Sequence, residues 1–73
     1  MPQPSRSGPS RLTLGRKIVA LRRRKAFSAQ ELADRAQMSK GYLSDIENGF
    51  RLPSLRILQA LAKALRVNIK DLL

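Results

Sequence analysis

The chain lacks the side chains on which much protein chemistry depends. Its 73 residues include no cysteine, histidine or tryptophan, and only two phenylalanines and one tyrosine. Without cysteine there is no disulfide framework, thiolate nucleophile, zinc ribbon or iron–sulfur site. Without histidine the usual general base and the commonest nitrogen ligand of metals are also missing. We therefore expect no metal site, no cofactor and no enzymatic activity.

Acidic side chains are scarce as well. Five aspartates and glutamates stand against 15 lysines and arginines, which leaves a net charge of +10. Such a charge on a small body attracts polyanions, so nucleic acid and an anionic membrane surface both fit it. Residues 1–25 contain eight basic residues and no acidic one, whereas residues 26–73 contain seven and five. The excess charge thus lies at one end of a nearly balanced chain.

Long hydrophobic runs are also absent. No apolar run approaches the roughly 20 residues that span a bilayer, and the N-terminus lacks the apolar segment of a secretory signal. No run of alternating β-branched residues predicts a strand. A chain of 73 residues is long enough for one domain only. We expect a soluble, cytoplasmic, all-α domain without a membrane partner.

A disordered basic tail is expected over residues 1–12, before a folded domain over residues 13–73. The segment Met1–Ser10 is rich in proline and serine and has no large apolar side chain after its first residue. It cannot bury enough apolar area to offset the entropy lost on ordering.

Five short helices are expected in the folded domain, each begun by a side chain that can cap its first turn. The expected N-caps are Thr13, Ser28, Ser39, Ser54 and Asn68. Glu31, three residues after Ser28, completes a capping box. The last helix, residues 69–73, is expected to close the core with Leu72 and Leu73.

Two of the expected helices, Ser28–Ala36 and Ser39–Asn48, are joined by a very short connection. Helices joined by three or four residues cross at about 90–120°, as in a DNA-binding helix-turn-helix. The major groove of B-DNA is about 12 Å wide and admits one α-helix, while the preceding helix crosses the backbone. An ordinary αα-corner has the same spacing, so spacing alone leaves both interpretations open.

The stretch Ser28–Leu65 resembles the helix-turn-helix of phage repressors and Cro proteins, also called the xenobiotic-response-element family. The shared motifs are ELA at 31–33, MS at 38–39, YLSDIENG at 42–49 and PSL at 53–55, preceded by LGRKIVALRRRK, which fits the pattern LGxxIxxLR. The resemblance covers about residues 13–73. It implies a lambda-repressor-like five-helix bundle that binds double-stranded DNA sequence-specifically, with the recognition helix 39–48 in the major groove.

The resemblance further implies a transcriptional repressor of bacterial or phage type, associated with the nucleoid, that binds operator half-sites as a homodimer. An antitoxin that binds a partner protein and represses its own operon uses the same domain, and so does a restriction–modification controller protein. A further C-terminal effector domain is left open. A membrane-active basic helix over Thr13–Lys25 is another alternative, although the expected core requires its apolar residues.

By position, the resemblance implies that base edges are reached by Lys40, Gly41, Ser44 and Asp45. Lys40 would donate to guanine O6 and N7, and Asp45 would accept from cytosine N4. Gly41 implies close backbone approach or no readout. Alternatively, Lys40 is a solvated cation or a phosphate contact, and Asp45 orients a neighbouring basic side chain or repels phosphate.

The same comparison implies phosphate contacts from Gln30, Ser39, Tyr42, Asn48, Arg51 and Arg22. Tyr42 is alternatively a partly packed ring. Arg22 is also expected to form a buried pair with Glu47 that ties the third helix to the first. The alternative for Arg22 is a place on a solvated basic face.

Three residues depart from the family pattern. Ala26 replaces the glycine after the first helix, Gln37 replaces the glycine of the turn, and Ala29 replaces the glutamine that opens the second helix. A side chain at positive φ costs energy, so we expect one or both connections to adopt a different backbone. The change at Ala29 removes a side chain that the family often uses on DNA.

Overall fold

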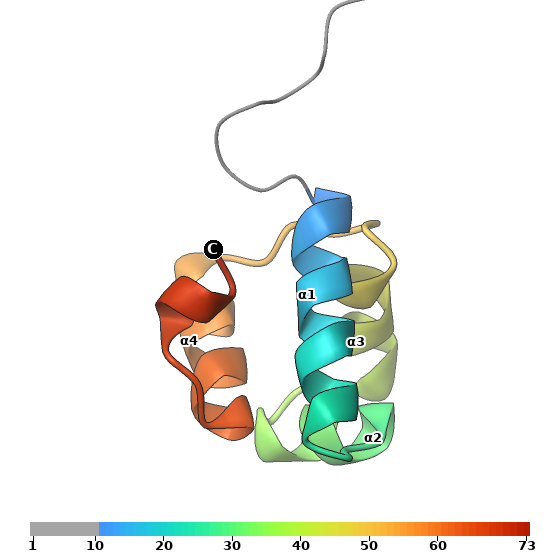
Figure 1. The fold of residues 1–73 in the computed structure, drawn as a ribbon. Coiled ribbons are helices and arrows are strands. Elements are labelled where there is room, and N and C mark those ends of the chain that lie inside the picture. The colour runs from blue at the N-terminus through green and yellow to red at the C-terminus, as the bar shows by residue number, and fades with distance from the viewer. Residues whose placement is uncertain (1–10) are drawn as a thin grey trace, which may run out of the picture.

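The computed structural model describes residues 11–73; residues 1–10, which make up most of the expected tail, lie outside the described part. The elements in chain order are α1 (Arg11–Arg24), α2 (Ala29–Arg35), α3 (Lys40–Glu47), α4 (Leu55–Leu65) and the 3₁₀ helix η1 (Ile69–Asp71) (Figure 1). The described residues are all-α, as predicted. The prediction of five α-helices is wrong, because the fifth segment closes through i→i−3 bonds from Asp71 and Leu72 and is too short for an α-helical turn.

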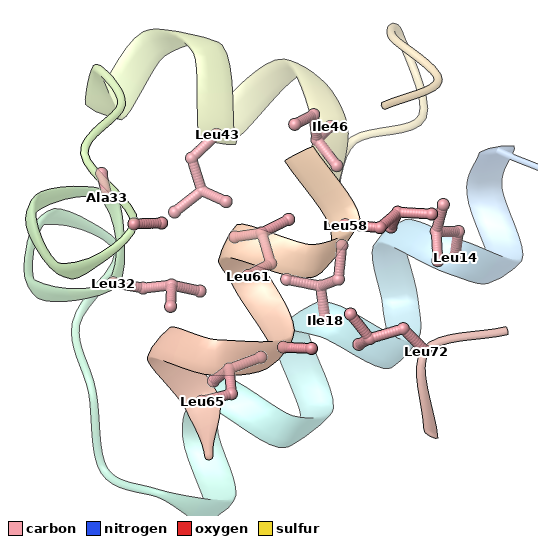
Figure 2. Close-up of a cluster of buried hydrophobic side chains, with 12 residues drawn as sticks. Leu14, Ile18, Leu32, Ala33, Leu43, Ile46, Leu58, Leu61, Leu65 and Leu72 are labelled. Carbon is pink, nitrogen blue, oxygen red and sulfur yellow. The ribbon is translucent and has the colours of Figure 1, made fainter. Parts of the chain in front are cut away.

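The helices enclose one apolar core. Its members are Leu14, Ile18, Leu32, Ala33, Ala36, Leu43, Ile46, Leu58, Leu61, Ala62, Leu65 and Leu72 (Figure 2). Full burial of one leucine or isoleucine contributes about 1.5–3 kcal/mol, so this cluster is the main source of stability. Leu72 closes the core as expected, whereas Leu73 is 48% exposed and does not.

The apolar face of α1 belongs to this core. Leu14 and Ile18 are buried, and α1 packs along α3 (Figure 1). Among the described residues, no helix combines the length and the apolar character needed to cross a bilayer. Because Leu14 and Ile18 are buried, the apolar residues on which the membrane-active alternative for α1 depends belong to the core.

Three helices begin at the expected N-caps. The hydroxyls of Ser28, Ser39 and Ser54 each accept a hydrogen bond from the backbone N–H three residues later. The Ser28 N–H in turn donates to the Glu31 carboxylate at 2.8 Å, and this backbone bond, followed by the Ser28 side chain, lowers the pKa of Glu31. The helix α1 begins two residues before Thr13, so the N-cap expected there is wrong. Nothing in the preceding residues, Arg11 and Leu12, stops a helix.

All four α-helices end in the same way, with one residue in the left-handed conformation. Only α3 uses glycine there; the others use Ala26, Gln37 and Arg66, with φ of 61°, 59° and 59°. In each case two backbone bonds, i→i−3 and i→i−5, close a Schellman motif. The expectation of a different backbone at Ala26 and Gln37 is therefore wrong. The motif holds these residues left-handed at a cost of about 1–2 kcal/mol each.

Candidate nucleic-acid interface

The helix α3 is anchored from one side only. Leu43 and Ile46 are fully buried and point into the core (Figure 2), which determines the face of α3 that meets solvent. Around this helix the predicted base contacts follow one another as a single stripe. Within it, Lys40 and Gly41 are exposed, and Ser44 and Asp45 are half-buried. The structure thus brings all four predicted base contacts onto the solvent side of one helix.

The first turn of α3 is the most open part of this stripe. A Cβ atom added at Gly41 would meet no other atom within 4 Å. The neighbouring Lys40 is exposed and has no hydrogen-bond or ion-pair partner among residues 11–73. A flat edge next to a free ammonium group leaves room for a ligand surface to approach the backbone at this point.

Farther along α3, Asp45 and Tyr42 both contact Arg51, which lies in the loop before α4. The Arg51 Nη2 atom is 3.6 Å from Asp45 Oδ2, and its guanidinium carbon is 4.8 Å from the centre of the Tyr42 ring. Because the paired side chains are 51% and 44% exposed, the ion pair contributes at most about 1 kcal/mol. A phosphate group can therefore compete with Asp45 for Arg51. Asp45 here orients a basic side chain, which was its alternative role.

The other predicted phosphate contacts are exposed but engaged within the chain. Gln30 donates its amide to Asp34 at 2.8 Å, and Asn48 donates to the Ser44 hydroxyl at 3.3 Å. The Ser39 hydroxyl oxygen caps α3, while its own proton is still available for donation. These polar groups lie on two helices rather than in one cluster, so a DNA duplex would have to meet them over a broad surface.

Arg22 has an internal role in this structure. Its Nε and Nη2 atoms donate to the two Glu47 carboxylate oxygens at 2.7 and 3.2 Å, and its Nη1 atom donates to the Phe27 carbonyl at 3.1 Å. The two charged side chains are only 14% and 10% exposed. This bidentate pair joins the last turn of α1 to the end of α3 and so fixes α3 against the bundle.

One residue that positions α3 was missed from the sequence. A Cβ atom at Gly15 would overlap the backbone carbonyls of Ile46 and Glu47. Only glycine permits α1 to lie this close to the end of α3. The available signal was a glycine inside a helical pattern, which costs about 1 kcal/mol relative to alanine and often has a packing reason.

The chain turns sharply at Gln37 between α2 and α3, and α3 exposes a polar face. This arrangement defines a helix-turn-helix domain. In agreement with this geometry, the helix-turn-helix family model matches residues 18–72. The chain belongs to this helix-turn-helix family, of the xenobiotic-response-element type.

Relatives place the chain among regulators. It is 38% identical over 58 residues to the immunity repressor protein of Bacillus phage phi105, covering 80% of this chain and 40% of the repressor. It spans about half the length of the curated relatives that it matches first.

Two solved structures have the same fold. The restriction–modification controller protein C.AhdI from Aeromonas hydrophila superposes with a TM-score of 0.85 at 28% identity, over 86% of this chain and 96% of that one. SinR from Bacillus subtilis, solved in complex with DNA, superposes with a TM-score of 0.77 at 35% identity, over 81% of this chain and 95% of that one.

Proposed function

We propose that the chain is the DNA-binding part of a transcriptional repressor, and that it inserts α3 into the major groove of double-stranded DNA. The observation that carries this proposal is the stripe of Lys40, Gly41, Ser44 and Asp45 on a helix whose opposite side is locked into the core. The likeness to SinR, which was solved in complex with DNA, supports DNA as the ligand. In this proposal the protein acts on DNA in the cytoplasm, at the nucleoid.

In this proposal two groups of residues have different tasks. Lys40 and Asp45 discriminate bases, Lys40 through guanine O6 and N7 and Asp45 through cytosine N4. Arg51, released from Asp45, binds phosphate together with Gln30, Ser39, Tyr42 and Asn48. Arg22 acts through Glu47 by holding α3 in place. The exposed arginines of α1 add affinity without selectivity.

The proposal includes a homodimer on inverted half-sites about one helical turn apart, since two copies present two copies of α3 to successive major grooves. In this proposal occupancy of such an operator blocks transcription, and the phi105 relative, named an immunity repressor protein, supports a repressor. A second candidate function is that of a restriction–modification controller protein. It is favoured by one observation, the superposition on nearly the whole of C.AhdI.

Selection from random duplex DNA tests the sequence-specific function. The chain is expected to enrich one motif, and Lys40→Ala is expected to lose preference at one position of it. The matched control is Lys70→Ala, which removes another exposed lysine, from η1, far from the stripe in sequence. Enrichment of no motif would leave a basic, non-selective binder and would contradict the proposal.

A further inference from the structure

A groove lies at the end of the molecule where α2 and α4 finish. The end of α4 and the turn after α2 meet at the lower end of the view in Figure 1. The groove has a volume of about 690 Å³ and is lined by Arg35, Ala36, Gln37, Ala60, Lys63, Ala64 and Arg66. Three alanines make an apolar floor, and three cations with one amide make the rim. None of the residues proposed to contact DNA lines it.

The rim is positive and largely unpaired. Lys63 and Arg66 are exposed and, like the Gln37 amide, have no side-chain hydrogen bond or ion pair among residues 11–73. Arg35 stacks on the Phe27 ring with its guanidinium carbon 4.4 Å from the ring centre, and this contact holds it at the groove edge. No acidic side chain lines the groove.

Two rim positions carry backbone strain. Gln37 and Arg66 are left-handed, with φ of 59° each. Glycine adopts this conformation freely, whereas other residues do so at a cost of about 1–2 kcal/mol. The chain thus keeps long polar side chains at two points of one groove where glycine would make the fold more stable. The Schellman bonds hold both residues in this conformation, as they do Ala26 outside the groove, and here they place two long polar side chains at the rim.

We propose that this groove binds an acidic segment of a partner protein, with carboxylates on Lys63 and Arg66 and small apolar side chains on the alanine floor. Charge complementarity carries the choice of partner, because the rim is cationic and contains no acid. The groove is formed by the ends of α2 and α4 together, and none of its lining residues belongs to the proposed DNA contacts. A protein docked there leaves the recognition stripe free.

The test measures binding of a fluorescent synthetic peptide of alternating glutamate and leucine to the full chain by fluorescence anisotropy. Lys63→Ala and Arg66→Gly are each expected to weaken binding about two- to fivefold, the range for an exposed ion pair. Arg24→Ala is the charge-matched control, since Arg24 is exposed on α1 outside the groove. It is expected to leave peptide affinity unchanged.

A second pair of variants changes no charge. Gln37→Gly removes a rim side chain and relieves strain, and Ala26→Gly relieves equivalent strain away from the groove. Both are expected to unfold at a higher temperature than the parent, but only Gln37→Gly is expected to weaken peptide binding. A loss of binding in a stabilised variant is not a folding defect.

Two results would overturn the proposal. If Arg24→Ala weakens peptide binding as much as Arg66→Gly does, the peptide is attracted by the overall positive charge of the chain and not by the groove. If Arg66→Gly weakens binding of random duplex DNA as much as peptide binding, the groove belongs to the DNA surface.

Discussion

Breaking the Arg22–Glu47 pair should destabilise the domain more than any exposed charge change. The pair is bidentate and about nine-tenths shielded from solvent. Loss of one partner of a buried pair costs about 3–5 kcal/mol, because the other charge is left unpaired. A domain of this size has only about 0.05–0.15 kcal/mol of stability per residue. Glu47→Ala should therefore lose about 3 kcal/mol and leave the domain marginally folded.

A double-mutant cycle measures the pair itself. We expect Arg22→Leu alone and Glu47→Ala alone to be strongly destabilised, and the double variant to lose less than the sum, with a coupling of about 1–3 kcal/mol. Urea unfolding followed by far-UV circular dichroism gives each free energy. Arg24→Leu, on the exposed side of α1, is the control and should change stability by no more than about 0.5 kcal/mol. If the double variant loses as much free energy of unfolding as the two single variants together, Arg22 and Glu47 are not coupled and the reasoning is refuted.

Three further changes have signs that the structure determines. Gly15→Ala would stabilise an open helix by about 1 kcal/mol, but here we expect a loss of about 1–3 kcal/mol from overlap with α3; a higher melting temperature would contradict the close approach. Ala26→Gly should raise the free energy of unfolding, measured with urea, by up to about 1 kcal/mol because it relieves left-handed strain. A lower free energy of unfolding would mean that the strain is absent. The pKa of Glu31 is lowered by its bonds to Ser28. The contribution of Glu31 to the free energy of unfolding is therefore present above the usual glutamate pKa and is lost as pH falls through the lowered value. Ser28→Ala should reduce this part of the pH dependence, as measured by urea midpoints along an acid titration, and an unchanged profile would show that the capping box does not contribute.

Local signals in the sequence predicted much of the fold. Ser28, Ser39 and Ser54 begin helices as expected because a cap acts within one turn and needs no tertiary partner. The N-cap predicted at Thr13 is wrong because nothing in Arg11 or Leu12 forbids an earlier start of α1. The left-handed Ala26 and Gln37 were not expected, because the Schellman bonds and the packing that offset their strain exist only in the folded chain.

The candidate site likewise has one part that local spacing predicts and another that depends on the folded chain. The helical spacing of Lys40, Gly41, Ser44 and Asp45 follows from α3 alone and was predictable. The contacts of Arg51 with Asp45 and Tyr42 depend on the path of a loop, so the spacing did not show them. The groove at the end of α4 joins residues distant in sequence and had no local signal at all.

The different roles proposed for Lys40 and Arg51 allow the most direct test of base reading by α3. The measurement is the affinity of Lys40→Ala and Arg51→Ala for a selected site and each of its single-base variants, over a series of salt concentrations. Arg51→Ala is predicted to weaken all sequences alike and to lower the salt slope by about one. Lys40→Ala is predicted to erase a discrimination of about 1–3 kcal/mol at one base pair and leave the others intact. Uniform weakening by both variants, with no change at any base pair, would contradict base reading by α3.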